Sequence, residues 1–129
     1  MRVLALDHGS VRCGCAISDP TGVLVRPLES IDPDVSEVGR LVSEYEVEFV
    51  VVGLPTTLSG DEGPQAEMAR AFAGELEEAL SVEVALFDER LTTRMAQRSG
   101  REGASADVDS LAAAHLLEGW LQSEGGQDQ

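Results

Sequence analysis

The chain has 129 residues, 43% of them hydrophobic, which is enough for one globular domain and excludes a disordered chain. It carries 24 acidic residues against nine basic ones, all of them arginine, and its net charge is −15. That balance excludes a basic coat that binds nucleic acid through charge alone. The acidic composition does not exclude a metal-dependent site that contacts phosphate.

The first part of the chain predicts three short strands. Residues 2–7 are apolar on both faces, which is typical of a strand buried on both sides. Residues 13–18 and 23–28 follow, with the turn sequence Asp-Pro-Thr-Gly between them. We expect these three strands to form an antiparallel meander.

An amphipathic helix and a central strand come next. Asp32 can cap the helix and Pro33 suits its first turn, and its apolar stripe consists of Val35, Val38, Leu41, Val42 and Tyr45. Residues 48–55 then show a central-strand pattern that ends in glycine and proline.

The rest of the chain predicts one more strand and three helices. A polar loop, residues 56–63, precedes a helix that opens at Pro64 and carries the spaced apolar residues Met68, Phe72, Leu76 and Leu80. Residues 82–87 form the fifth strand. A short helix over about residues 92–99 and a last helix over about residues 107–122 follow.

This order of elements predicts an α/β fold, a five-stranded mixed sheet with helices on both faces. We expect residues 1–122 to form a single domain and residues 123–129 to be a polar, disordered tail. No apolar run approaches the roughly 18 residues of a membrane span, and the apolar start is too short for a signal peptide. The sequence therefore predicts a cytoplasmic protein without a membrane partner.

Cys13 and Cys15 are the only cysteines. They stand two residues apart on an expected strand, where a straight backbone holds their side chains parallel. We interpret them as buried free thiols. A metal site built on the pair is the alternative, but no further cysteine or suitably spaced histidine completes it.

Acidic residues stand at the ends of three predicted elements. Asp7 ends the first strand, Asp88 and Glu89 end the last strand, and Asp109 lies in the first turn of the last helix. Strand ends and helix starts are where an α/β sheet carries its chemistry. Each acid also has an ordinary explanation, as a turn residue, a solvated charge or a partner of the helix dipole.

Two details favour a site. Asp7 follows an apolar strand, so its carboxylate emerges from the core, where an uncompensated charge is costly. Asp109 shares a helix face with Ala112, Ala113, Leu116 and Trp120, and we expect that face to point the acid inward at the sheet. Because acids that meet at one edge repel each other, the pattern predicts a divalent cation such as Mg²⁺, which prefers carboxylate oxygens.

Four blocks resemble, in order, the signature blocks of the YqgF family: ALDHGSVRCGCAISDPTG, VVGLPTTLSGDEGPQAE, FDERLTT and VDSLAAAHLLEGWL. The resemblance covers residues 2–122. That family comprises ribonuclease-H-like proteins described as candidate Holliday-junction resolvases and as nucleases that process the 5′ end of precursor 16S ribosomal RNA. It implies a ribonuclease-H-like fold with three layers, in agreement with the order of elements.

Carried over residue by residue, the resemblance implies Asp7, Glu89 and Asp109 as the catalytic, metal-binding acids. Asp88 is the neighbour left open, because strand alternation turns only one of two adjacent residues toward a given face, and the family's block favours Glu89. The implied substrate-binding or supporting residues are Arg12, Arg90, Thr92 and Arg94. For Arg12 a structural salt bridge is an equal alternative.

The implied chemistry is two-metal phosphodiester hydrolysis with Mg²⁺ or Mn²⁺, in which an activated water attacks phosphorus and a second ion stabilises the leaving oxygen. The expected substrate is structured RNA, namely precursor ribosomal RNA. Branched DNA is the alternative. A resolvase would need a homodimer for paired cuts, whereas a processing nuclease could be a monomer.

Two other classes of function stay open. The stretch 94–108 is shorter than the family's usual basic loop and lacks lysine, which favours a non-catalytic ribonuclease-H-like protein that binds a partner in replication, transcription or ribosome assembly. An actin-like or sugar-kinase-like nucleotide-binding domain also begins with a strand, an aspartate and a glycine turn. That class needs two lobes, and 129 residues provide one.

Overall fold

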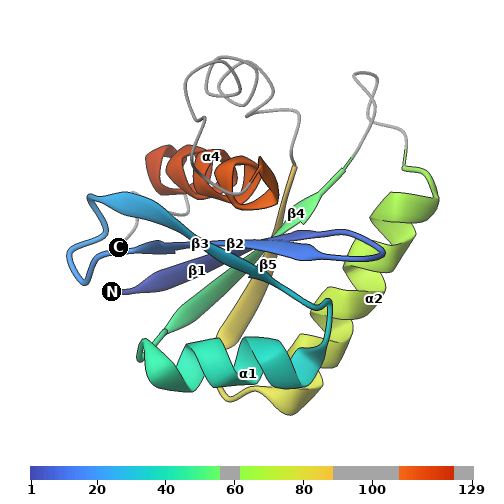
Figure 1. The fold of residues 1–129 in the computed structure, drawn as a ribbon, viewed down its shortest axis with the longest axis horizontal. Coiled ribbons are helices and arrows are strands. Elements are labelled where there is room, and N and C mark those ends of the chain that lie inside the picture. The colour runs from blue at the N-terminus through green and yellow to red at the C-terminus, as the bar shows by residue number, and fades with distance from the viewer. Residues whose placement is uncertain (56–61, 89–107, 124–129) are drawn as a thin grey trace.

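A five-stranded sheet lies at the centre of the computed structural model, which describes residues 1–55, 62–88 and 108–123 (Figure 1). Its strands are β1 (Val3–His8), β2 (Cys13–Ser18), β3 (Val25–Ile31), β4 (Phe49–Leu54) and β5 (Glu83–Asp88), in the spatial order β3-β2-β1-β4-β5. The first three strands form an antiparallel meander, and β4 and β5 run parallel to β1. The predicted mixed sheet is confirmed.

Helices cover both faces of this sheet (Figure 1). α1 (Val35–Glu44) and α2 (Pro64–Ala79) lie on one face, and α4 (Val108–Gln122) lies on the other. Because side chains alternate along a strand, the core divides in two. Leu4 and Leu6 of β1 pack with α1 and α2, whereas Val3 and Ala5 pack with α4. The predicted arrangement of three layers is therefore confirmed.

The continuous apolar runs of β1 and β4 follow from their central position. Val3 to Leu6 and Val50 to Val52 are all 0% exposed, because each strand has a neighbour on both sides and a helix layer on both faces. Burial of this apolar surface is the main stabilising contribution to the fold.

The start of β3 differs from the sequence prediction. The strand begins at Val25 rather than at residue 23, because the Asp19 carboxylate accepts hydrogen bonds from the backbone N–H groups of Val23 (2.8 Å) and Leu24 (3.1 Å). Those bonds hold both residues in the turn, where their side chains are exposed.

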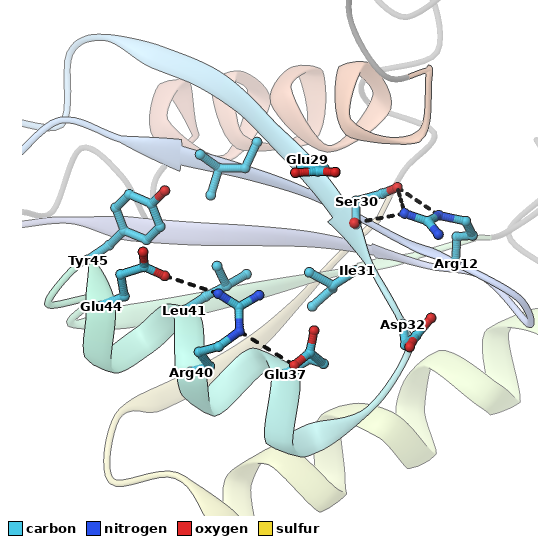
Figure 2. Close-up of a pocket in the computed structure, with 11 residues that line it drawn as sticks. Arg12, Glu29, Ser30, Ile31, Asp32, Glu37, Arg40, Leu41, Glu44 and Tyr45 are labelled. Atoms are coloured by element: carbon cyan, nitrogen blue, oxygen red, sulfur yellow. Dashed lines mark hydrogen bonds and ion pairs between the residues drawn. The ribbon is translucent and has the colours of Figure 1, made fainter.

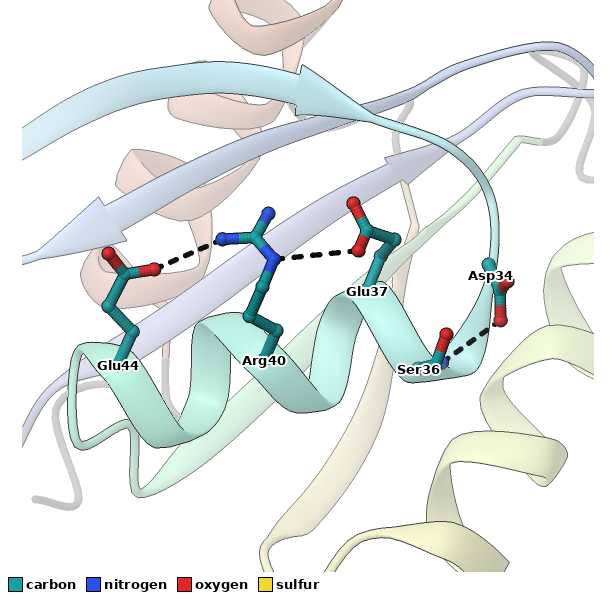
Figure 3. Close-up of polar contacts among 5 residues, drawn as sticks. All are labelled: Asp34, Ser36, Glu37, Arg40 and Glu44. Atoms are coloured by element: carbon teal, nitrogen blue, oxygen red, sulfur yellow. Dashed lines mark hydrogen bonds and ion pairs between the residues drawn. The ribbon is translucent and has the colours of Figure 1, made fainter.

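Two helix details also differ from the prediction. The N-cap of α1 is Asp34 rather than Asp32, and the Asp34 carboxylate accepts a hydrogen bond of 3.0 Å from the Ser36 N–H (Figure 3). On α2, the spaced apolar residues Phe72 and Leu76 belong to the buried face, which also contains Ala66, Ala69 and Ala73. Met68 of the same spacing is 42% exposed.

Three predicted segments cannot be compared with the structure. Residues 56–61 of the expected loop, the expected short helix over 92–99 and residues 124–129 of the expected tail lie outside the described residues. Among the helices that the structure describes, none has the length and apolar character to cross a membrane.

Candidate active site

Two of the three predicted acidic ligands, Asp7 and Asp109, meet at one end of the sheet. Asp7 has the same parity in β1 as Val3 and Ala5, so its side chain belongs to the α4 face. Gly14 is its partner on β2. The backbone of Asp109 lies directly on that glycine, since a Cβ built at Gly14 would stand 2.0 Å from the Asp109 carbonyl oxygen. One glycine thus separates the two acidic residues.

A buried hydrogen bond fixes the first turn of α4 against β2. The backbone N–H of Cys15 donates to Oγ of Ser110 at 3.1 Å, and Ser110 is 0% exposed. The bond lies where the register between β2 and β3 shifts. Together with the close approach at Gly14, it sets the position of Asp109. Neither Gly14 nor Ser110 was predicted from the sequence to belong to the site, although a glycine inside an apolar strand is a signal of close backbone approach.

Asp109 itself is exposed, so the expectation that it points inward at the sheet is wrong. The buried face of α4 consists of Ser110, Ala113, Ala114, Leu116, Leu117 and Trp120. Because a helix turns by about 100° per residue, the side chain that points toward the sheet at the start of α4 is that of Ser110, one residue after Asp109. Asp109 stands at the rim of the α4–sheet interface, and Asp7 is half-buried.

The carboxylates of Asp7 and Asp109 both affect the pKa of the nearby Cys13 thiol. A hydrogen bond with Cys15 and burial raise the pKa of the Cys13 thiol, and the negative charges of Asp7 and Asp109 act in the same direction. Cys13 and Cys15 are buried free cysteines, as predicted. Since a protonated, buried thiol is a poor ligand and nucleophile, the chemistry at this end of the sheet is left to oxygen atoms.

Asp88 belongs to the opposite face. It has the same parity in β5 as Val84 and Leu86, which pack with the α1 and α2 layer. A hydrogen-bonded ion pair with Arg70 lowers the pKa of Glu62, and the nearby Asp88 carboxylate acts in the opposite direction. Asp88 therefore lies near the start of α2, away from the face that Asp7 occupies.

His8, the residue after Asp7 in β1, also faces α2. Its ring centroid lies 4.5 Å from that of Phe72. Burial lowers the pKa of His8, and the charge of Glu75 opposes that shift. The end of β1 thus directs a carboxylate to one face of the sheet and an imidazole to the other.

Arg12 is held by Ser30 rather than by a carboxylate in the described part of the chain. Its Nε donates to Ser30 Oγ at 2.9 Å, and one Nη donates to the carbonyl oxygen and Oγ of Ser30 at 2.9 and 2.7 Å (Figure 2). It borders a cavity of about 470 Å³ between β3 and α1. Arg40 on the same cavity is instead paired with Glu37 (3.5 Å) and Glu44 (3.1 Å) (Figure 3).

The remaining predicted site residues, Glu89, Arg90, Thr92 and Arg94, lie outside the described residues. Within residues 1–55, 62–88 and 108–123, no group of three His, Cys, Asp or Glu side chains could hold a metal ion. The two carboxylates that do come together offer oxygen donors beside buried thiols, and the pKa of the Cys13 thiol is raised. This donor set fits Mg²⁺ or Mn²⁺, with the remaining ligands supplied from elsewhere, and does not fit a thiolate-bound zinc.

Comparisons with known proteins agree with the resemblance seen in the sequence. The RuvX family model, described as a Holliday junction resolvase, matches residues 1–123. A protein of Rhodococcus erythropolis named as a candidate pre-16S rRNA nuclease is 43% identical over 136 residues, which cover 93% of this chain and 77% of that protein. One of Clostridium beijerinckii with the same name is 37% identical over 132 residues, covering 94% and 96%.

The solved structures show the fold. The Thermus thermophilus RuvC in complex with a Holliday junction substrate superposes with a TM-score of 0.61 over 97% of each chain, at 15% sequence identity. The ribonuclease-H-like fold that the resemblance implied is thereby confirmed, and the structure is RuvC-like in its fold.

Proposed function

Since the chain belongs to the RuvX family, the YqgF family of the sequence resemblance, we propose that it is a metal-dependent nuclease that processes the 5′ end of precursor 16S ribosomal RNA in the cytoplasm. The names of its relatives support the substrate. The observation that carries the proposal is the approach of Asp7 and Asp109 across Gly14, at one end of the sheet.

In this proposal Asp7, Glu89 and Asp109 hold one or two Mg²⁺ or Mn²⁺ ions. Strand alternation supports Glu89 over Asp88, because Asp88 belongs to the α2 face and the next residue of a continuing strand would belong to the face of Asp7. When bound, the metal supplies electrostatic stabilisation of the charge that develops on the phosphate oxygens. The half-buried carboxylate of Asp7 is a fixed ligand, because its backbone belongs to the central strand of the sheet.

Arginine side chains would hold the substrate. Arg12 is oriented by uncharged Ser30 atoms, so its positive charge is available to a backbone phosphate. Arg90, Thr92 and Arg94 are proposed to serve the same purpose. Local cations of this kind compensate, close to the site, for a net charge of −15 that opposes long-range attraction of RNA.

Resolution of branched DNA is the second candidate, because the family model carries the description of a Holliday junction resolvase. It would use the same acids on a different substrate. It would also require a two-fold dimer that places two sites on one junction, whereas RNA processing does not.

A cleavage assay on two substrates tests the proposal. A precursor-rRNA 5′ leader fragment and a synthetic four-way DNA junction are each incubated with Mn²⁺ or with EDTA, using the wild type, Asp7→Asn and Glu78→Gln. Glu78→Gln is a matched control, since Glu78 is exposed near the end of α2 and the substitution changes the charge equally. We expect metal-dependent cleavage of the RNA that falls at least about 100-fold in Asp7→Asn and persists in Glu78→Gln.

Other outcomes revise the proposal. Cleavage of the DNA junction alone would assign the resolvase activity. Equal cleavage by the wild type and Asp7→Asn would overturn the site. Absence of cleavage together with absence of Mn²⁺ binding by calorimetry would favour the non-catalytic interaction protein.

A further inference from the structure

A small cavity of about 200 Å³ lies beside the end of β1, on the face opposite Asp7. His8, Gly9 and Ser10 line it from β1 and the turn that follows, and Gln65 and Met68 line it from the start of α2. Asp7 and His8 are consecutive residues of β1. Asp7 belongs to the proposed catalytic face, and His8 belongs to the face with the cavity. Ligands of α/β sheets bind outside the carboxyl ends of the strands, where both are located.

The walls of the cavity combine flat or polarisable surfaces with neutral polar edges. His8 contributes a ring, Met68 a thioether, and Ser10 and Gln65 a hydroxyl and an amide. Met68 is 42% exposed, so part of its side chain is open to a ligand at the cavity, whereas Phe72 and Leu76 of the same helix are buried. Such a lining fits a planar, uncharged ring with hydrogen-bonding edges, since it contains no Asp, Glu, Lys or Arg side chain.

The cavity is preformed rather than assembled by a ligand. The Gly9 N–H donates to the Arg12 carbonyl oxygen at 3.0 Å, and a Cβ at Gly9 would stand 2.7 Å from that oxygen, so the turn requires glycine. On the other wall, the ring of Phe72 is buried and contacts His8. Both walls are therefore fixed to the core.

We propose that this cavity binds one unpaired nucleobase of the RNA strand, next to the nucleotide whose phosphate is cleaved. The inference rests on the proposed function, because it assumes that a strand crosses the end of β1. Unpaired bases are the parts of RNA that proteins bind by stacking and by hydrogen bonds to their edges. The cavity's volume suits a single base and not a base pair. A phosphate would be disfavoured there, because the nearby charge acting on His8 is the carboxylate of Glu75.

Two readouts on the full-length protein test the cavity. In the first, leader-fragment RNA strands that carry the fluorescent base 2-aminopurine at successive positions are titrated with protein in EDTA, so that binding is measured without cleavage. In the second, strands with a single abasic nucleotide at successive positions are cleaved with Mn²⁺. The proteins compared are the wild type, Met68→Ala, His8→Ala and Glu78→Ala, the last a control at an exposed position near the end of α2.

We expect one position at which the wild type alters 2-aminopurine fluorescence and at which the abasic nucleotide lowers kcat/KM about 5-fold or more, the lower limit for loss of one stacked base. In Met68→Ala and His8→Ala, the change in fluorescence and the loss of kcat/KM caused by the abasic nucleotide should each be less than about 2-fold. In Glu78→Ala both should equal those of the wild type. Because Met68 is exposed, its substitution keeps the fold even if His8→Ala does not.

The results separate this inference from the nuclease proposal. Fluorescence changes and abasic penalties that are identical in wild type and Met68→Ala, or absent at every position, would overturn the base-binding cavity. A position-specific fluorescence change that depends on Met68, without cleavage of any strand, would support the cavity and contradict the nuclease.

Discussion

The carbonyl oxygen of Asp109 occupies the space that a side chain at Gly14 would need, with a built Cβ only 2.0 Å from that oxygen. Gly14 is in turn the strand partner of Asp7. The lack of a side chain at one position of β2 therefore allows an acid from the first strand and an acid from the last helix to share one end of the sheet.

Gly14→Ala is expected to push the first turn of α4 off the sheet. The added methyl group clashes with backbone atoms, so we expect the free energy of unfolding to fall by about 1–3 kcal/mol or more, and cleavage to fall about 100-fold as Asp109 is displaced. Urea unfolding and the cleavage assay measure both. Gly74→Ala is the control: nothing lies within 4 Å of a Cβ there, and a helical alanine should add about 0.5–1 kcal/mol. Wild-type cleavage by Gly14→Ala would contradict the role of this approach.

Asp88→Asn is expected to retain cleavage within about 3-fold of wild type, whereas Glu89→Gln should lose at least about 100-fold. The reason is that Asp88 belongs to the α2 face, near Glu62. Side-by-side rate measurements at saturating Mn²⁺ decide the point. The reverse ranking would exchange the roles of the two acids.

Arg12→Ala is expected to weaken binding of the RNA leader and to lower the slope of log affinity against log salt concentration by about one, as for the loss of one phosphate contact. Its guanidinium is held by Ser30, whereas Arg40 on the same cavity spans two carboxylates. Arg40→Ala should therefore leave the slope unchanged. If both variants shift the slope equally, or neither does, Arg12 is a structural residue that ties its turn to β3.

Asp19→Asn is expected to lower stability in a way that depends on pH. A hydrogen bond from the Thr21 hydroxyl, with others from the backbone N–H groups of Val23 and Leu24, lowers the pKa of Asp19 below its ordinary value of 3.8. The unfolded chain then binds more protons than the folded one, so the contribution is present above about pH 4 and is lost as the pH falls through the folded-state pKa. The difference in unfolding free energy between wild type and Asp19→Asn should shrink in acid.

Urea unfolding from neutral pH down to about pH 3 measures that difference. Thr21→Ala removes the hydrogen bond that is the largest single cause of the lowered pKa of Asp19, so it should reproduce part of the pH-dependent loss of unfolding free energy. A difference that stays constant over the whole range would contradict a lowered pKa at Asp19.

The sheet could be predicted from the sequence because its signals are local and agree with one another. β1 and β4 are apolar on both faces, and the structure buries both faces. The predicted start of β3, at residue 23, was wrong for an equally local reason. Val23 and Leu24 continue the apolar pattern of the strand, but the Asp19 carboxylate binds their N–H groups and removes them from it.

Helix faces were harder to predict, since the largest apolar residues need not define the buried side. α2 packs through Ala66, Ala69 and Ala73 beside Phe72, and small side chains of this kind leave Met68 outside. On α4 the buried polar residue is Ser110 rather than the acid before it, because the hydroxyl has a partner in the Cys15 N–H. Which side chain finds such a partner depends on tertiary contacts that spacing alone does not contain.

Asp7 and Asp109 could be selected from the sequence as candidates because one ends a strand and the other begins a helix. Their approach depends on Gly14, whose role emerges only when α4 is placed on the sheet. Parity along β5 could assign Asp88 to a face only after the neighbouring strands were known.

The anchoring hydrogen bond between Cys15 and Ser110 joins residues 95 positions apart, from the second strand and the last described helix. During translation β1 and β2 leave the ribosome exit tunnel before that helix does. A nascent chain that ends before α4 would carry Asp7 without Asp109. Under the proposed function, the acids of the site come together only after α4 has left the tunnel, so a nascent chain without α4 should not yet cut the ribosomal RNA beside it.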